Sequence, residues 1–439
     1  MSFAGENKKL VFIVILAVIV RLILSAFTFH GDILFIWSVP TYFLSGVIDY
    51  FYRIGGEFPQ ALNTNFPVYY PPVSYLFTGL WLYIVRYFSP TLIPWLSQVR
   101  DISLSSGSIQ PEMVLSLISP AELRWNLILL KSSYILIDLL ITAIIYKIVV
   151  SRKLLATAIY LFNPVILFSV YMLGQIDNLT LLLILLFLYL AVKTPKFSLL
   201  PLALSAGVKT LPLFFFAPFT IVISRNLRNA VISLLLTVMI FILINLPWAG
   251  NSSLPLLKSY FPPFISPFPQ LALRPDSLWV IFRIAAAVIT GAYLIVLYLK
   301  SKKIINQGRI TYLAVATVCL FFSAYSAMKV NYYVILIGLF SVAWVERPNA
   351  IKKITIFSLL WIMAYIYTRP LMGEMLSPIF GLDKAASLPS SRDLVNPFFR
   401  YEHLGLLARM ILDMWIVVEG YLYGTKGLKM KSLVKAKNY

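Results

Sequence analysis

His30-Gly31-Asp32, directly after the first long apolar run, are the first residues of the chain whose types and spacing could carry chemistry. A carboxylate at the end of such a run, beside a glycine and between apolar walls, is partly desolvated, which raises its affinity for a proton. We therefore expect Asp32 to act as a general base, with His30 beside it in the same site. The alternative is structural: Asp32 caps the amphipathic stretch 33–44, as Asp often does where a helix begins.

A stiff aromatic stretch follows at residues 65–72 (NFPVYYPP), in which the prolines preset the backbone before a helix. Tyrosines held on such a stretch suit stacking on a sugar and hydrogen bonding to it, so Tyr69 and Tyr70 are candidate sugar-binding residues. The alternative is that they belong to the aromatic belt of a membrane interface.

Residues 173–178 (LGQIDN) form a polar group between two apolar runs. Polar side chains near membrane depth are costly, so they usually line a cavity or pair with one another. We expect Gln175 and Asp177 to face a binding site, although a plain polar turn between two spans is the alternative. Asn178-Leu179-Thr180 matches a glycosylation sequon, but so close to a span the match is expected to be accidental.

Four basic residues fall at the ends of apolar runs: Lys209, Arg274, Lys329 and Arg369. An anionic lipid-phosphate head group would need such cations, and Arg binds phosphate in a bidentate way. Each of them alone could instead snorkel to the phosphates of the surrounding lipid. We expect the four to include the residues that bind the phosphate of a lipid-borne ligand.

Two further charges, Arg21 and Asp138, lie inside apolar runs. Charges at membrane depth are functional candidates by default, but we expect these two to pair with each other structurally. The chain offers few of the usual metal ligands, since it has one cysteine and two histidines. We therefore expect no metal and no cofactor, although carboxylates alone could hold Mg²⁺.

The composition shows what must position these residues. Sixty per cent of the 439 residues are apolar, only 12% are charged, and the mean hydropathy is +0.85. Such an apolar excess requires lipid as the solvent. The net charge of +20 comes from small basic groups between apolar runs, which argues against nucleic-acid binding and is typical of a multispanning protein. The composition predicts an all-α polytopic membrane protein.

Apolar runs long enough to cross a bilayer, or nearly so, predict about twelve spans. They cover residues 10–29, 126–149, 154–172, 179–193, 197–211, 211–224, 229–248, 277–299, 310–327, 331–345, 353–368 and 404–424. A thirteenth run, 73–87, is decided by charge. If it does not cross, the basic clusters after each pair of spans all fall on the side of Lys8 and Lys9. We therefore interpret 73–87 as a helix that lies in or against the outer leaflet.

This topology makes residues 1–424 a single transmembrane domain, followed by a basic cytoplasmic tail, 425–439. Both termini are expected in the cytoplasm and the protein in the cell membrane. The external segments are then 30–124, 173–178, a Pro- and aromatic-rich loop 249–276, and a late loop 369–403. External segments of this size are longer than the loops that simply connect two spans, so we place the candidate site on the external face.

Taken in order, these motifs resemble the polyprenyl-phosphate-sugar-dependent glycosyltransferases of the GT-C superfamily. The archaeal and bacterial proteins similar to GPI mannosyltransferases, and the eukaryotic dolichyl-phosphate-glucose glucosyltransferases, are the most alike. The resemblance covers roughly residues 10–220 and fades later: residues 327–331 (AMKVN) keep a lysine but lack the His and Glu of the family motif, and Lys209 is followed by Thr210 rather than glutamine. Its motifs are His30-Gly31-Asp32, Tyr70-Pro71-Pro72, Arg124, Asp138, Asn163-Pro164, Gly174-Gln175-Ile176-Asp177 and Lys209 with Pro212.

The resemblance implies a GT-C-like arrangement of the spans, with juxtamembrane helices in the first external loop. It also implies inverting transfer of a hexose, mannose or glucose, from a polyprenyl- or dolichyl-phosphate donor to a lipid-linked glycan or another acceptor. Asp32 would be the base, and the basic residues would stabilise the leaving phosphate. The main alternative is a transporter or flippase of a lipid-linked or anionic solute. Transporters, however, usually carry their charges near mid-bilayer rather than at span ends.

Overall fold

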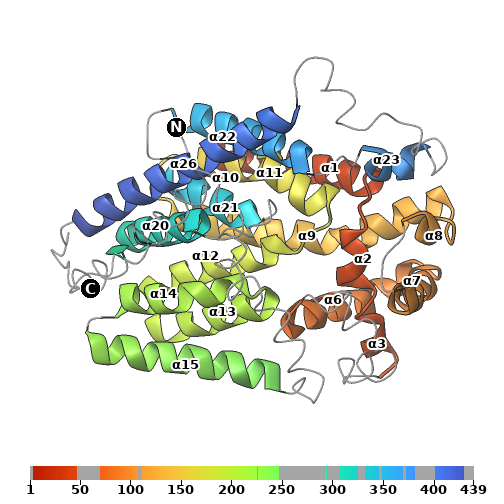
Figure 1. Cartoon of the computed structure of the whole chain (residues 1–439), viewed down its shortest axis with the longest axis horizontal. Coiled ribbons are helices and arrows are strands. Elements are labelled where there is room, and N and C mark those ends of the chain that lie inside the picture. Colours follow the sequence, from red (N-terminus) through yellow and green to blue (C-terminus); the bar gives the residue numbers. More distant parts are fainter. Residues whose placement is uncertain are drawn as a thin grey trace.

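The computed structural model describes residues 3–46, 70–106, 111–224, 226–246, 288, 292–293, 307–324, 332–345, 349–368, 372–380 and 401–429. In this part of the chain the regular structure is entirely helical. Long helices run beside one another along one axis, and a group of shorter helices gathers at one end of them (Figure 1). The prediction of an all-α protein is confirmed for the described residues.

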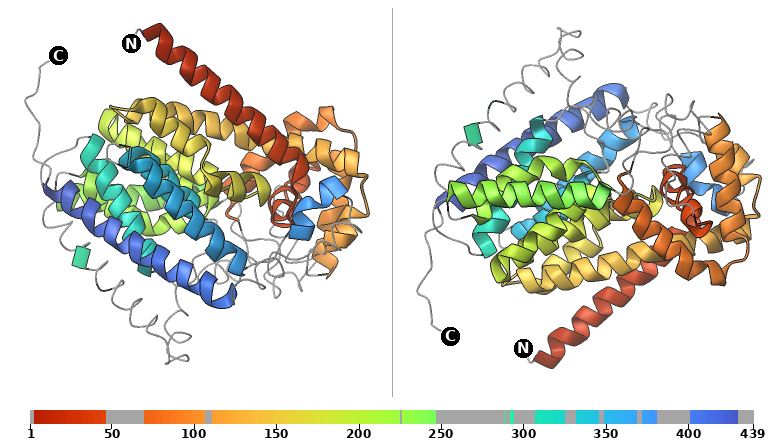
Figure 2. Two further views of the ribbon diagram at one scale, coloured as in Figure 1. Left: turned by 90° about the horizontal axis from the view of Figure 1, so that it is seen from above. Right: turned by 90° about the horizontal axis from the view of Figure 1, so that it is seen from below.

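Four helical stretches are long and apolar enough to cross a membrane, by length and composition. Only 22% of the apolar window of the first stretch is buried, and only 11% of that of the last. Figure 2 shows the first of them leaving the body of the molecule toward its N-terminal end. Apolar surface of this extent requires lipid, so the chain is a membrane protein. The stretches are α1 (Phe3–Phe27), α9 (Pro120–Ile148), α10 to η2 (Lys153–Met172) and α15 (Leu227–Asn245).

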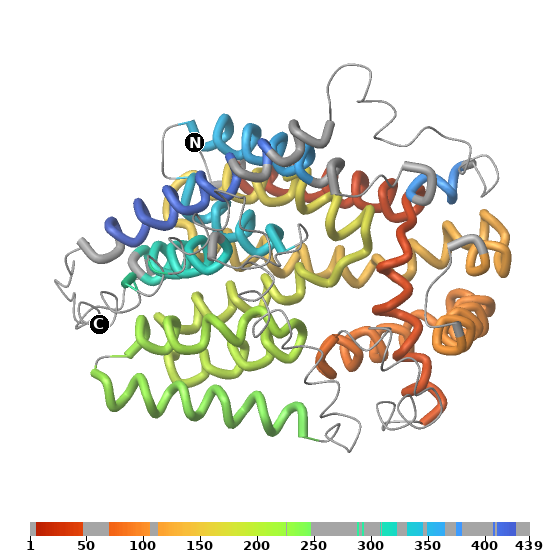
Figure 3. Tube along the Cα trace, viewed as in Figure 1, coloured from red at the N-terminus to blue at the C-terminus, as the bar shows by residue number. Residues whose placement is uncertain are grey.

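The other helices of the bundle pack between and beside these four. Among them α12 and α13 lie side by side, and α15 packs against α13 (Figure 3). Every apolar run expected to span falls on helical segments in its described part, although only residues 288 and 292–293 of the run 277–299 are described. The count of about twelve spans stays a prediction. These helices are α12 (Asp177–Lys193), α13 (Pro195–Val208), η3 (Leu211–Phe215), α14 (Phe216–Ile223), α20 (Gln307–Ala324), α21 (Tyr333–Ala343), α22 (Ala350–Thr368) and α26 (Tyr401–Lys429).

The group of shorter helices lies where α1 ends and α9 begins (Figure 1). It contains the helix expected at 73–87, and α6 indeed carries exposed apolar side chains such as Leu80 and Ile84. At its end Arg86 lies over the rings of Tyr83 and Tyr87, 4.1 and 4.7 Å from their centroids. The group comprises α2 (Asp32–Trp37), α3 (Thr41–Leu44), α6 (Pro72–Val85), η1 (Arg86–Phe88), α7 (Leu92–Ser106), α8 (Pro111–Leu115) and α23 (Met372–Phe380).

Local sequence signals explain where two of the spanning stretches begin and break. At the start of α9, Ser119 and Glu122 form a capping box, with Pro120 at the first helical position. The stretch Lys153–Met172 breaks into α10 (Lys153–Leu161), α11 (Pro164–Ile166) and the π-helical η2 (Leu167–Met172). Asn163 causes this break together with Pro164, because its side chain caps α11 and the proline cannot continue α10.

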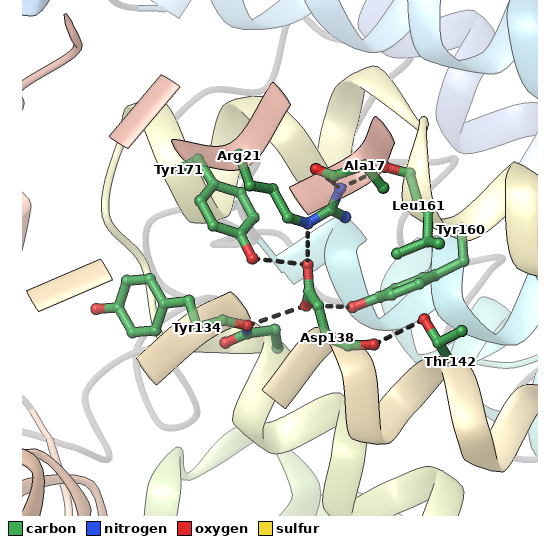
Figure 4. A network of polar contacts seen from close by, with 9 residues as sticks. Ala17, Arg21, Tyr134, Asp138, Thr142, Tyr160, Leu161 and Tyr171 are labelled. Atoms are coloured by element: carbon green, nitrogen blue, oxygen red, sulfur yellow. Dashed lines mark hydrogen bonds and ion pairs between the residues drawn. The ribbon is translucent and has the colours of Figure 1, made fainter. Parts of the chain in front are cut away.

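A buried polar cluster, which we call the Asp138 cluster, joins α1, α9, α10, η2 and α12 (Figure 4). Arg21 Nε donates to Asp138 Oδ2 at 2.8 Å, and the Tyr171 hydroxyl donates to the same oxygen at 2.9 Å. Tyr160 and Asn178 donate to Oδ1 at 2.7 and 3.1 Å. All five side chains are buried. The predicted pairing of Arg21 with Asp138 is confirmed, and the cluster around this pair joins five helical segments.

Candidate functional site

Asp32 is the first residue of α2 and lies at the corner where α1 gives way to that helix. Gly31 occupies the N-cap position and no side chain caps α2, so the capping alternative is wrong. The Asp32 carboxylate instead accepts a hydrogen bond at Oδ2 from Gln175 Nε2, 2.6 Å away. Its side chain is 27% exposed, so the carboxylate is both held and reachable.

His30 is buried and fixes the backbone of this corner. Its Nδ1 accepts a hydrogen bond from the Asp32 N–H at 3.0 Å, so the ring proton belongs on Nε2. The separation of 3.7 Å between Nδ1 and Asp32 Oδ1 is therefore not a hydrogen bond. On the other side of the corner, Lys131 Nζ donates to the Thr28 carbonyl at 2.7 Å. These contacts set the direction in which the Asp32 carboxylate points.

Gly174 lets the loop before α12 pass close to α2. Its φ of +74° lies in the left-handed region, and a Cβ added there would lie 2.6 Å from Ile33 Cβ. The Gly174 carbonyl accepts from the Tyr134 hydroxyl at 2.9 Å, and that hydroxyl accepts from Trp37 Nε1 at 3.0 Å. Only glycine fits this close approach, which brings Gln175 to the carboxylate on α2.

The Gln175 amide links the exposed carboxylate to a buried ion pair. Its Oε1 accepts from the Tyr70 hydroxyl at 3.0 Å and lies 3.4 Å from Lys209 Nζ. Lys209 Nζ lies 2.8 Å from Asp177 Oδ1 and 2.9 Å from Oδ2, and the angles make Oδ2 the hydrogen-bond acceptor. The ammonium also faces the rings of Tyr70 and Tyr332, 5.3 and 4.9 Å from their centroids. We call His30, Asp32, Tyr70, Gln175, Asp177 and Lys209 the Asp32 cluster.

The electrostatics of the Asp32 cluster divide it into an inner and an outer part. Lys209 and Asp177 are buried and neutralise each other. Burial raises the pKa of the Tyr70 hydroxyl well above its usual value, and the carboxylates of Asp32 and Asp177 raise it further. Tyr70 therefore remains a proton donor toward Gln175. Because its cation is committed to Asp177, Lys209 would have to exchange that partner before it could bind a phosphate.

Six of the ten candidate site residues therefore meet in one cluster, from four separate segments of the chain. The other four lie outside the described residues: Tyr69, Arg274, Lys329 and Arg369. The external loop 249–276 lies outside them as well, and so does most of the late loop 369–403.

Several residues that support the site were not predicted from the sequence. Lys131 had a usable signal, since it is a charge within an apolar run. Tyr134 and Tyr332 had none, because a tyrosine in an apolar helix is equally a core residue. Asn178 belonged to the polar group 173–178 and matched a sequon, and its burial against Asp138 agrees with an accidental match.

The cluster offers a partly exposed carboxylate oriented by an amide, a phenol donor, and a buried cation nearby. A carboxylate so placed can take a proton from a hydroxyl group that reaches it within hydrogen-bond distance. Among the described residues, no three His, Cys, Asp or Glu side chains are grouped so that they could hold a metal ion. Comparison with family models, with curated proteins and with solved structures found no match for this chain.

Proposed function

We propose that this protein is an inverting glycosyltransferase that moves a hexose, mannose or glucose, from a polyprenyl- or dolichyl-phosphate donor to a lipid-linked glycan or another acceptor. The observation that carries the proposal is the Asp32 carboxylate, which is 27% exposed and held by Gln175 at 2.6 Å at the end of the first spanning helix. The resemblance of the motif order to the GT-C superfamily supplies the reaction class.

In the proposed step, Asp32 takes the proton of an acceptor hydroxyl as that oxygen attacks the anomeric carbon. The bond between this carbon and the phosphate oxygen breaks on the opposite face, which inverts the configuration. The polyprenyl phosphate leaves with the bonding electron pair and needs charge stabilisation rather than a proton. Gln175 orients the base, and Tyr70 lies beside it to stack on or bond to the sugar.

The leaving phosphate is assigned to the cations Lys209, Arg274, Lys329 and Arg369. Lys209 is the one whose surroundings are described, and it lies 3.4 Å from the same Gln175 oxygen that Tyr70 bonds. It would reach a phosphate by exchanging Asp177 for a phosphate oxygen, which keeps the ammonium paired throughout. We assign it this role as part of the proposal.

The proposed topology has about twelve spans in a GT-C-like arrangement, with both termini in the cytoplasm and the site on the external face. Two observations support it. The described helices of the expected external segments, α2, α3, α6, α7, α8 and α23, gather at one end of the bundle (Figure 1). The exposed apolar face of α6 and the aromatic residues around Arg86 suit a helix that lies against the outer leaflet.

Reconstitution into lipid vesicles tests the proposal. Transfer from polyprenyl-phosphate-mannose or -glucose to a lipid-linked acceptor is measured for the parent protein and for Asp32→Asn, which keeps the shape and the acceptor oxygen for Gln175. We expect the variant to lose transfer by roughly 10²–10⁴-fold. The matched control is Asp101→Asn, an exposed carboxylate on α7 that pairs with Arg100.

Three outcomes would overturn the proposal. In the first, Asp32→Asn transfers sugar at a near-normal rate. In the second, Asp101→Asn loses as much transfer as Asp32→Asn. In the third, the parent protein moves a lipid-linked or anionic solute across the vesicle membrane without any transfer, which would establish the transporter alternative.

A further inference from the structure

A groove lies between α10 and α22, far in sequence from the Asp32 cluster and sharing no residue with it. It encloses a cavity of about 370 Å³ whose walls are mostly apolar, including Ile159, Phe162, Leu359 and Ile362. The break at Asn163-Pro164 ends the α10 wall, and Asn163 Nδ2 donates to the Ser358 hydroxyl across the groove at 3.3 Å. Irregular backbone at membrane depth is tolerated where it lines a cavity.

Along one face of α22 the side chains change from a cation to a hydroxyl and then to apolar groups. Lys352, Thr355, Leu359 and Ile362 follow each other at intervals of three or four residues, which places them on one face of the helix. Lys352 is exposed in the first turn, the exposed Thr355 brings a hydroxyl to the groove, and the last two residues are apolar. At a rise of about 1.5 Å per residue, the cation and the hydroxyl are offset by roughly 4.5 Å.

On each wall an exposed cation stands three residues before a residue that lines the groove, Leu155 on α10 and Thr355 on α22. Arg152 is exposed at the residue before α10, as Lys352 is at the beginning of α22. The two helices run in the same direction, so both N-terminal ends lie at the same end of the groove (Figures 1 and 3). The helix dipoles add partial positive charge there, which favours an anion.

We propose that this groove is a binding site for an anionic glycerophospholipid of the surrounding bilayer. The phosphate lies between Arg152 and Lys352, the glycerol oxygens accept from the Thr355 hydroxyl, and one hydrocarbon chain fills the apolar part toward Phe162 and Ile362. The order of groups along the face of α22 that carries Lys352, Thr355, Leu359 and Ile362 is the order of phosphate, glycerol and chain in such a lipid. The site is independent of the sugar-transfer site.

The test is native mass spectrometry of protein released from nanodiscs that contain equal amounts of phosphatidylglycerol and phosphatidylcholine. For the parent protein we expect retained lipid to be mainly phosphatidylglycerol. In the double variant Arg152→Gln, Lys352→Gln, the preference should fall roughly tenfold, because two cations at the phosphate are lost. Thr355→Val, which removes the hydroxyl without a change of volume, should lower retention of both lipids by about threefold.

The matched control is Lys193→Gln, Arg228→Gln, which removes two exposed cations away from the groove. It should keep the preference of the parent protein. The inference is overturned if the control loses the preference as fully as the groove variant, since general surface charge would then explain it. It is equally overturned if the parent protein retains both lipids alike, or if the groove variant keeps its preference while its thermal unfolding matches that of the parent.

Discussion

The Asp138 cluster and the Asp32 cluster use nearly the same kinds of side chain, but their central carboxylates differ in exposure to a ligand. In the first, one carboxylate accepts from Arg21, Tyr160, Tyr171 and Asn178 and is buried. In the second, the cation is committed to a second, buried carboxylate, while Asp32 accepts from Gln175 and remains 27% exposed. A carboxylate, a cation, tyrosines and an amide occur in both.

The difference teaches that residue type alone does not separate structural from chemical charges in a membrane protein. A carboxylate with four donors around it has no capacity left for a substrate proton, and its charges serve to join helices. A carboxylate that is partly exposed can still accept a proton from a ligand. The access of a ligand to the carboxylate therefore distinguishes the two clusters.

The largest expected effect is a difference in stability between a variant of Asp138 and a variant of Asp32. Asp138→Asn leaves Arg21 buried without its counter-charge, and it should lower the free energy of unfolding by about 3–5 kcal/mol. Asp32→Asn should change it by less than about 0.5 kcal/mol. Thermal unfolding in detergent measures both. Adding Arg21→Met to Asp138→Asn should restore part of the loss; a double variant less stable than Asp138→Asn would argue against a structural ion pair.

The next largest effect is expected at Gly174, where the loop before α12 passes close to Ile33 of α2. Gly174→Ala combines a left-handed φ with the contact to Ile33, so we expect a loss of roughly 2–3 kcal/mol in stability and a fall in transfer. The matched control is Gly46→Ala. Gly46 has a φ of +76° but nothing within 4 Å of the added Cβ. Equal losses at the two positions would contradict a role for the Ile33 contact.

A smaller effect is expected when the amide that orients the base is removed. Gln175→Leu should lower kcat of sugar transfer by about tenfold, since one hydrogen bond to the Asp32 carboxylate is lost, and KM should change little. Steady-state kinetics in vesicles separates the two constants. An unchanged kcat with a raised KM would mean that Gln175 binds substrate rather than positions the base.

The smallest effect is expected at the phenol. Tyr70→Phe removes the donor to Gln175 and should lower transfer by about fivefold, while Tyr83→Phe, exposed on α6, should leave it unchanged. Because the pKa of Tyr70 is raised above 10.0, the phenol stays protonated below that pH. The alkaline side of the pH profile should therefore be the same in the parent and in Tyr70→Phe. A parent-specific fall below pH 10 would contradict this assignment.

Much of the fold was predictable because lipid imposes a strong compositional signal. Long apolar runs predicted the long helices α1, α9, α12, α13, α15, α20, α21, α22 and α26, and the pairing of Arg21 with Asp138 followed from the cost of lone charges at membrane depth. The break of the stretch Lys153–Met172 into three segments was not predicted. Hydropathy is insensitive to such a break, which depends on the backbone effect of Asn163-Pro164.

The residues of the Asp32 cluster could be predicted, but the hydrogen bonds and the ion pair between them could not. Asp32, Tyr70, Gln175 and Lys209 were chosen as polar residues at the ends of apolar runs, and they do meet. That Lys209 is neutralised by Asp177 could not be predicted, because the two are 32 residues apart and helix rotation decides which residue each faces. Tertiary packing alone sets such rotations.

The first turn of α12 serves both clusters at once, with a consequence for folding fidelity. Asp177 turns to Lys209 and the adjacent Asn178 turns to Asp138, although consecutive helical residues point about 100° apart. A one-residue slip of α12 during assembly would move both partners together and leave the buried ammonium of Lys209 without its counter-charge. Misregistered packings of α12 are therefore penalised twice, so two neighbouring residues select a single register during insertion.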